Sequence, residues 1–164
     1  MKFISHRGNI DGRNKQTENH PDQILKAISL GYDVEIDIWD VDCKLWLGHD
    51  GPEYETNVTF LLEHHQKLLI HCKNDAALFK LHSVSELNIF THADDPFTIS
   101  SKNNLLIHPH TKTAYRRGIL IMPEMSTYTV DEILQFDGIV SDNIDFMTRP
   151  MGLPPISSTQ YRLR

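Results

Sequence analysis

The sequence predicts a single α/β domain in which short parallel strands alternate with modest helices. Short apolar runs, most of them β-branched or rich in Leu, recur along the chain as in strands that are buried on both faces. Signals for helix starts fall between these runs. A length of 164 residues suits one domain with a real core, and no linker or low-complexity segment divides it.

Eight strands are expected from the apolar runs, at residues 3–5, 33–38, 45–47, 68–72, 87–91, 105–108, 119–122 and 138–141. The first helix should begin at Pro21 and end at Gly31, because proline suits the first helical position and glycine the end. The caps expected for three further helices are Asn57, Asn74 and Thr129, the last with Glu132 as its capping-box partner. Residues 94–101 and 111–117 leave room for one or two turns each, so the outer helical layer should be thin there.

Composition and charge narrow the class of protein. We expect residues 1–148 to form the domain. Residues 149–164, with three prolines and a Ser-Ser-Thr run, should form an extended tail.

No apolar run reaches the ~18–20 residues of a membrane helix, and no room precedes the first strand for a signal peptide. We therefore expect a cytoplasmic protein without a transmembrane segment. Cys43 and Cys72 should stay reduced. A net charge of −6 argues against a nucleic-acid partner.

Reactive side chains gather at the carboxyl ends of the expected strands, and the sequence has ten histidines to supply them. They are His6, Arg7, Glu35, Asp37, His49, Asp50, His71, Lys73, His92, His108, His110, Glu124 and Asp142. Parallel α/β folds build their sites at this edge, because the loops converge there. Of the three later histidines, we expect His108 to reach the site before His92 or His110.

Glu35 and Asp37 predict a cation site. Residues two apart in a strand point to the same face, so both carboxylates would face inward while the aliphatic residues around them pack outward. Carboxylates this close repel each other unless a cation lies between them or one is protonated. A divalent cation bound through oxygen, such as Mg²⁺, Ca²⁺ or Mn²⁺, resolves the repulsion. The alternative is an exposed edge strand with alternating polar residues.

The basic side chains near this pair predict phosphate chemistry. His6 and His49 could form an acid and a base, because histidine titrates near neutral pH. Arg7 and Lys73 would supply positive charge for a phosphate group. Alternatively, the two histidines could have only a structural role, and Arg7 and Lys73 could be solvated at the surface.

Five motifs in the same order resemble the glycerophosphodiester phosphodiesterase family. They are Ile4-Ser-His6-Arg7-Gly8, Glu18-Asn19, Val34-Glu35-Ile-Asp37-Ile, Gly48-His49-Asp50 and Asp137-Gly-Ile-Val-Ser-Asp142. The resemblance implies a compact TIM-type (β/α) barrel, here with shortened or missing outer helices because such barrels typically take ~250 residues. It also implies metal-dependent hydrolysis of a small-molecule or lipid-derived glycerophosphodiester to a phosphomonoester and an alcohol, through a cyclic phosphate.

The same resemblance implies the role of each matching residue. His6 and His49 become the general acid and base, Arg7 a phosphate ligand, and Glu35 and Asp37 metal ligands. One motif departs from the family, whose third strand usually ends in Glu-x-Lys with the Glu as third metal ligand.

This chain has His71-Cys72-Lys73 at that position. Either His71 binds the metal, which shifts the preference towards Mn²⁺ or Zn²⁺, or Glu124 or another group supplies the ligand, or two carboxylates and water hold the ion. Mg²⁺, Ca²⁺ or Mn²⁺ is expected ahead of Zn²⁺.

Two further functions fit the same residues. One is a phospholipase-like lyase that stops at the cyclic phosphate. The other is a non-catalytic barrel that binds phosphate or a phosphosugar. The replacement of the family's third acidic metal ligand by His71 would favour this function. Thin outer helices would leave part of the barrel wall exposed, so an oligomer is compatible with the sequence.

Overall fold

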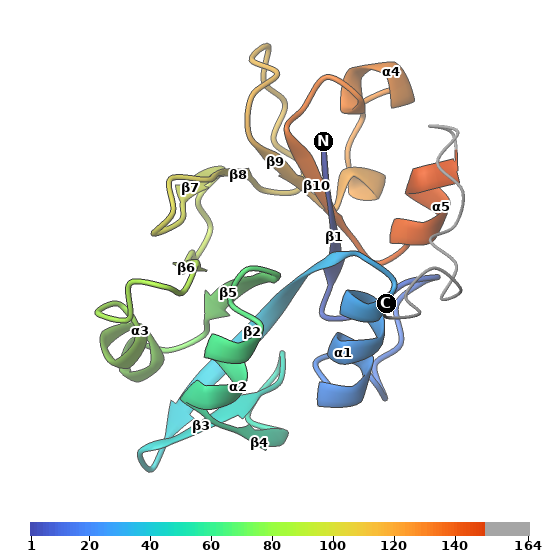
Figure 1. The fold of residues 1–164 in the computed structure, drawn as a ribbon. Coiled ribbons are helices and arrows are strands. Elements are labelled where there is room, and N and C mark those ends of the chain that lie inside the picture. Colours follow the sequence, from blue (N-terminus) through green and yellow to red (C-terminus); the bar gives the residue numbers. More distant parts are fainter. Residues whose placement is uncertain (150–164) are drawn as a thin grey trace, which may run out of the picture.

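The structure, a computed structural model, describes residues 1–149, in which ten strands form one curled mixed sheet (Figure 1). The elements in chain order are β1 (Lys2–His6), α1 (Pro21–Ser29), β2 (Asp33–Val41), β3 (Lys44–Leu47), β4 (Tyr54–Thr56), α2 (Val58–Glu63), β5 (Leu68–Cys72), α3 (Asp75–Leu81), β6 (Ile89–Phe90), β7 (Phe97–Ile99), β8 (Leu105–Ile107), β9 (Ile119–Ile121), the 3-10 helix η1 (Pro123–Met125), α4 (Val130–Ile133), β10 (Gly138–Ser141) and α5 (Ile144–Thr148). The predicted α/β class is therefore confirmed.

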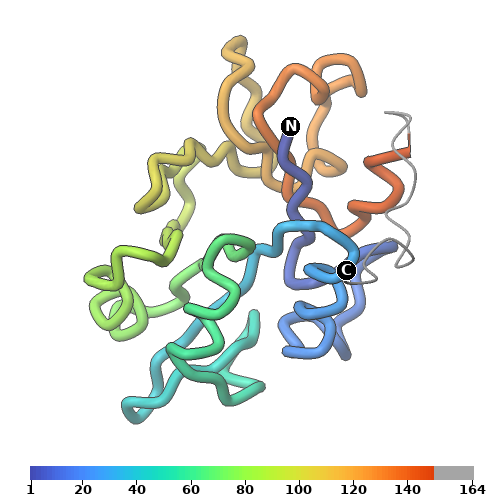
Figure 2. Tube along the Cα trace, in the orientation of Figure 1, coloured from blue at the N-terminus to red at the C-terminus, as the bar shows by residue number. Residues whose placement is uncertain are grey.

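The parallel strands follow one another around the sheet in the order β6, β5, β2, β1, β10, β9, β8. Strands β3 and β4 extend β2 as an antiparallel meander, and β7 pairs antiparallel with β8. The tube in Figure 2 follows this course from β1, in blue, round to α5, in red, which returns to pack against β1. The sheet thus curls about a common centre and brings the carboxyl ends of its parallel strands to one side.

The closed TIM-type barrel expected from the family resemblance is wrong, because the sheet is an open half-barrel. Within residues 1–149, no ladder joins β6 to β7 or β8. Strand β6 is only two residues long, and Ile89 is joined across the opening to Ser101 alone, whose amide donates to the Ile89 carbonyl at 2.8 Å. The next strand along the chain, β7, pairs with β8 and not with β6.

Local signals predicted most elements correctly. Strands form at all eight expected places, and the expected caps are present: the side chains of Asn57, Asn74 and Thr129 accept from the amides of Phe60, Ala77 and Glu132. Strand β4 and helix α5 were not expected. Within residues 94–101, where one or two turns were expected, Phe97–Ile99 form β7 and pair with β8. The helical layer is thin here, as expected.

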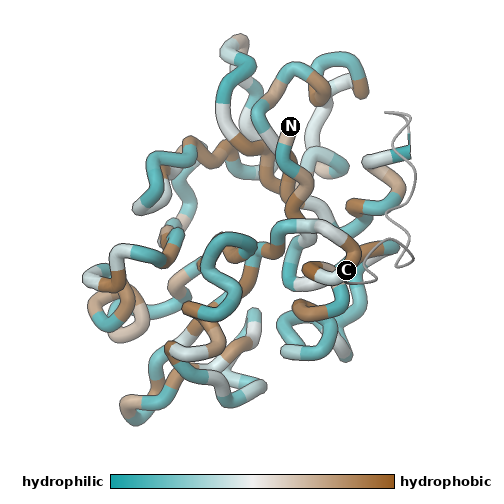
Figure 3. The backbone as a smooth tube through the Cα atoms, viewed as in Figure 1, coloured by the Kyte–Doolittle hydropathy of each residue, from teal (hydrophilic) through white to brown (hydrophobic). Residues whose placement is uncertain are grey.

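Alternation along the strands separates two apolar clusters. The larger one lies between the sheet and the helices and includes Val34, Ile36 and Ile38 of β2. The smaller one fills the inside of the curl, with Ile4, Leu69, Phe90, Leu106, Ile119 and Val140. In Figure 3, brown hydrophobic stretches follow the strands, and teal hydrophilic stretches are common in the loops between them. Strand β2 lies between β1 and β5, which excludes the exposed edge strand considered as an alternative.

The described residues contain no helix long and apolar enough to cross a membrane. Of the extended tail expected over residues 149–164, all but Arg149 lies outside the described part of the chain.

Candidate functional site

The inner apolar cluster carries a polar layer directly above it. In a strand, side chains two residues apart share a face, so Ile4 is followed inside the curl by His6, and Leu69 by His71. The same spacing of two residues relates Val140, near the end of β10, to Asp142. This layer lies at the carboxyl ends of the parallel strands, where the sequence placed the site.

Glu35, Asp37 and His71 form a buried group that could hold a metal ion. Asp37 and His71 are register partners on adjacent strands, and Asp37 Oδ1 lies 3.0 Å from His71 Nδ1. The same nitrogen lies 4.0 Å from Glu35 Oε1, and one ligand atom from each residue falls within 4.8 Å of the others. These separations are compatible with one shared ion, with bonds of about 2.0–2.6 Å depending on the metal.

The surroundings of the two carboxylates fit a cation. Glu35 Oε2 is buried without a hydrogen-bond partner, and an unpaired buried acceptor is costly. Asp37 Oδ2 is already held, since it accepts from Asn19 Nδ2 at 3.0 Å and lies 2.9 Å from Arg7 Nε. Its other oxygen, Oδ1, makes a hydrogen bond of 3.0 Å with His71 Nδ1, and a cation bound by both atoms would replace this hydrogen bond.

Burial and mutual repulsion push the proton affinities of these groups apart. Burial, followed by the charge of Asp37, raises the pKa of Glu35 to about 7. Burial also opposes ionisation of Asp37, but the hydrogen bond with His71 and the charges of Arg7 and Lys73 outweigh it and hold the pKa well below its usual range. Burial lowers the pKa of His71, which keeps its imidazole neutral and able to ligate. Without a cation, Glu35 is thus the member that carries the spare proton.

Arg7 is placed by a strained turn after β1. Its φ of 55° lies in the left-handed region, its amide donates to the Glu35 carbonyl at 2.8 Å, and its carbonyl accepts from the amide of Asn19, itself at φ 62°. Non-glycine residues held in this region are common at functional sites. The guanidinium lies between Asp37 and Glu18. Glu18 also accepts two hydrogen bonds from Arg13, at 3.1 Å on Oε2, the oxygen that Arg7 contacts, and at 3.2 Å on Oε1.

Each candidate catalytic histidine has a carboxylate partner. His6 Nδ1 lies 2.8 Å from Asp142 Oδ1, and His6 Nε2 lies 3.8 Å from Glu35 Oε2. Burial opposes its charged form, but the Asp142 hydrogen bond and the Glu35 charge outweigh it and raise the pKa of His6. His49 Nδ1 lies 2.6 Å from Asp50 Oδ1 in a more exposed position.

A cavity of about 410 Å³ brings these groups together. Six of the seven residues predicted for the site line it: His6, Arg7, Glu35, His49, His71 and Lys73. The seventh, Asp37, is 1% exposed and lies behind Arg7, His71 and Lys73, with Lys73 Nζ 3.6 Å from its Oδ1. The cavity therefore gathers the predicted acid–base pair, phosphate ligands and metal ligands on one side of the sheet.

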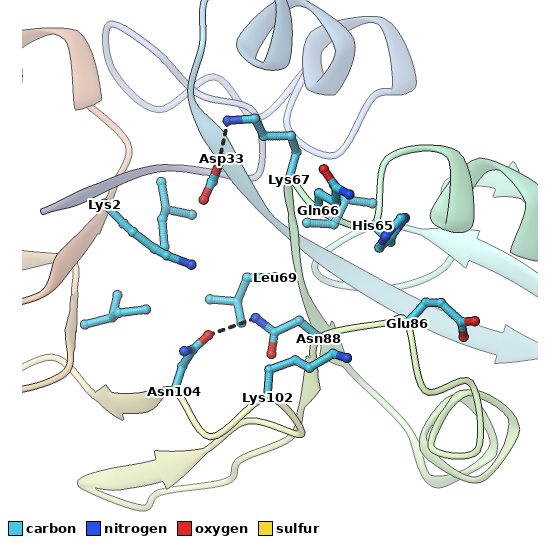
Figure 4. Close-up of a pocket in the computed structure, with 13 residues that line it drawn as sticks. Lys2, Asp33, His65, Gln66, Lys67, Leu69, Glu86, Asn88, Lys102 and Asn104 are labelled. Carbon is cyan, nitrogen blue, oxygen red and sulfur yellow. Dashed lines mark hydrogen bonds and ion pairs between the residues drawn. The ribbon is translucent and has the colours of Figure 1, made fainter.

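A second cavity of similar volume lies at the amino ends of the strands (Figure 4). Four of its polar side chains pair with one another: Lys67 Nζ lies 2.9 Å from Asp33 Oδ1, and Asn88 Nδ2 donates to Asn104 Oδ1 at 2.9 Å. Among the described residues, the cluster able to hold a metal belongs to the first cavity and not to this one.

The structure adds residues whose role sequence reasoning did not assign. Asp142 was noted at a strand end, but its contact with His6 depends on the pairing of β1 with β10. His92 stacks between His71 and His108, with ring centroids 4.8 and 3.9 Å away, so both later histidines line the cavity and His110 does not. Burial and the charge of His92 lower the pKa of His108 to about 4.

Glu124, one alternative for the third ligand, is exposed on η1. Its Oε1 accepts from the Ser141 hydroxyl and the Asp142 amide, outside the Glu35–Asp37–His71 group. Of the two protein side chains considered for that place, the geometry favours His71.

Comparisons of the chain with protein-family models, with curated proteins and with solved structures find no match. The chemistry of the site has to be judged from its own residues.

Proposed function

We propose that this chain is a metal-dependent phosphodiesterase that hydrolyses a glycerophosphodiester-like substrate to a phosphomonoester and an alcohol. One observation carries the proposal: a single cavity brings together three kinds of group. They are a buried cluster that could hold a cation, two histidines paired with carboxylates, and the cationic side chains of Arg7 and Lys73. The parallel strands follow one another in chain order around the sheet, which suits a TIM-type barrel left open on one side.

Glu35, Asp37 and His71 would hold the divalent cation. Two carboxylates and one imidazole suit Mn²⁺ as well as Mg²⁺ or Ca²⁺. When bound, such an ion neutralises charge on the phosphoryl oxygens and orients the phosphate. Glu35 Oε1 lies 4.0 Å from His71 Nδ1, and a cation bound by both oxygens of this carboxylate would also satisfy its buried, unpartnered Oε2.

The remaining groups would bind the phosphate and move protons. Arg7 offers a planar fork and Lys73 a point charge to the phosphate oxygens. His6, whose pKa is raised, suits the general acid that protonates the leaving alcohol. His49 then suits the base that takes the proton of the attacking hydroxyl, either from the glycerol moiety or from water. Such pairing of acid with base favours catalysis over a purely phosphate-binding role.

The test is turnover of bis(p-nitrophenyl) phosphate and of glycerophosphodiesters with Mg²⁺, Ca²⁺, Mn²⁺ and Zn²⁺ in turn. We expect turnover that EDTA abolishes, and a loss of about 10²–10⁴-fold in His6→Ala and in His49→Ala. His82→Ala is the matched control, since His82 is exposed at the end of α3.

If no cation supports turnover and both variants behave like the parent, the enzymatic proposal is wrong. A cyclic phosphate that persists without ring opening would instead identify a lyase. Phosphate binding without any turnover would identify a binding module.

A further inference from the structure

The cavity that holds the candidate site has two chemically different halves. Its charged side chains come from β1, β2 and β5, from the loops that follow β1 and β3, and from Asp142 after β10. The opposite side is lined by the stacked rings of His92 and His108 and by five apolar residues from β6, the loop after β8, and the segment from β9 into η1: Phe90, Pro109, Ile121, Met122 and Met125. We call these five residues the apolar half.

The apolar half is more than buried core. Met125 is 48% exposed at the cavity, and the Met122 backbone, at φ 50°, is held in the left-handed region where η1 begins. Exposed methionines beside a polar cluster are typical of a binding surface for apolar groups. Phe90 lines the same cavity and is stacked on His71, with ring centroids 4.7 Å apart.

A positively charged amino alcohol would find no partner on this side. The acidic residues that line the cavity are Glu35 and Asp142, and both belong to the charged half. Asp142 is already engaged by His6 and Asn9. One face of Phe90 is covered by His71, so these described residues do not form the aromatic cage that a quaternary ammonium group requires.

We propose that the apolar half binds the alcohol portion of the phosphodiester, and that this alcohol is an uncharged apolar chain or ring. The inference rests on the proposed function, in which Arg7 and Lys73 would bind the phosphate in the cavity that these apolar residues also line. With the phosphate fixed there, the ester bond to the second alcohol would lead across the cavity towards Ile121 and Met125. The substrate class is then a phosphodiester of glycerol type with an apolar second alcohol.

The test is calorimetric binding of phosphate esters to the full chain loaded with Mn²⁺. Ethyl, butyl and hexyl phosphate should bind progressively more tightly, by about three- to four-fold for each methylene group that becomes buried. Phosphocholine should bind no more tightly than ethyl phosphate. Phenyl phosphate distinguishes a ring from a chain: binding as tight as that of hexyl phosphate would favour a ring.

Met125→Ser should reduce the hexyl-to-ethyl affinity ratio at least about three-fold, whereas Leu134→Ser, on a similarly exposed residue outside the cavity, should leave it unchanged. Ile121→Thr provides a second variant, with circular dichroism to check folding. Equal affinities along the series, or tighter binding of phosphocholine than of hexyl phosphate, would overturn the inference while leaving turnover intact. Chain-length dependence without turnover under any cation would overturn the proposed function alone. Absence of binding by every ester would overturn both.

Discussion

Asp142 Oδ1 lies 2.8 Å from His6 Nδ1, although 136 residues separate the two along the chain. The contact follows from the parallel pairing of β1 with β10, in which Ser5 lies opposite Ser141. Asn9 Nδ2 donates to the same carboxylate oxygen at 2.8 Å and fixes its position. The carboxylate in turn orients the imidazole, so that the other nitrogen, Nε2, faces Glu35.

Asp142→Asn should lower the pKa of His6, because the carboxylate that favours the imidazolium is lost. If His6 is the general acid, the alkaline limb of the pH–rate profile moves to lower pH and kcat falls by about ten-fold, part of the 10²–10⁴-fold that acid–base catalysis supplies. Asp145→Asn is the control, since Asp145 pairs with Arg149 on the surface of α5. An unchanged profile in Asp142→Asn would show that the contact is merely structural.

Mn²⁺ affinity should depend on pH through Glu35. Below about pH 7 this carboxyl holds a proton in the metal-free protein, and the ion must displace it. Affinity should therefore rise by up to ten-fold per pH unit below 7 and level off above it. Calorimetry in buffers of different ionisation enthalpy would measure the proton released.

Glu35→Gln should weaken Mn²⁺ binding and remove this part of the pH dependence. Glu86→Gln, in the cavity at the other end of the strands, should change neither. A pH-independent affinity in the parent protein between pH 6 and 8 would contradict the assignment of Glu35 as a ligand.

His71→Glu should change which cation binds best. A third carboxylate replaces a nitrogen ligand, so affinity for Mg²⁺ and Ca²⁺ should rise relative to Mn²⁺, by about ten-fold in the ratio. His92→Glu adds the same charge within the ring stack but outside the metal-binding group, and serves as the control. Equal effects of the two variants would show that charge alone, rather than ligation by residue 71, sets the preference.

Gly8→Ala should destabilise the fold more than Gly12→Ala. Both glycines have positive φ, at 82° and 126°, so both substitutions carry a backbone cost. Only at Gly8 would the new Cβ meet neighbours, with backbone atoms of Gln23 and Ile24 at 3.2 Å. Urea unfolding should show an excess loss of about 1 kcal/mol in Gly8→Ala. A loss equal to that of Gly12→Ala would mean that α1 adjusts without cost.

Local patterns in the sequence were enough to place much of the site. The alternation of Val34, Glu35, Ile36 and Asp37 correctly predicted which side chains of β2 face the helices and which face inward. The caps at Asn57 and Asn74 depend on residues three positions away and so could be predicted from spacing. His71 could be proposed as a ligand because it stands where the family that the motifs resemble has an acidic metal ligand.

Features that depend on distant pairings could not be predicted in this way. The sheet is open beside β6, and β7 pairs with β8 instead of β6. The spacing of Phe97 and Ile99 is compatible with a strand but does not indicate which strand it pairs with. The stack of His71, His92 and His108 depends on three segments meeting inside the curl. Sequence periodicity says which face a side chain takes, and not which strand it meets there.

The alternation along β2 also protects the fold against misalignment. Sliding this strand by one residue against β1 and β5 would turn its two carboxylates towards the helix-covered core and its isoleucines towards the cavity. Unpaired charges buried in that apolar core would cost several kcal/mol each. The residues proposed to hold the cation therefore also disfavour any one-residue shift in the alignment of β2, whether or not an ion or substrate is bound.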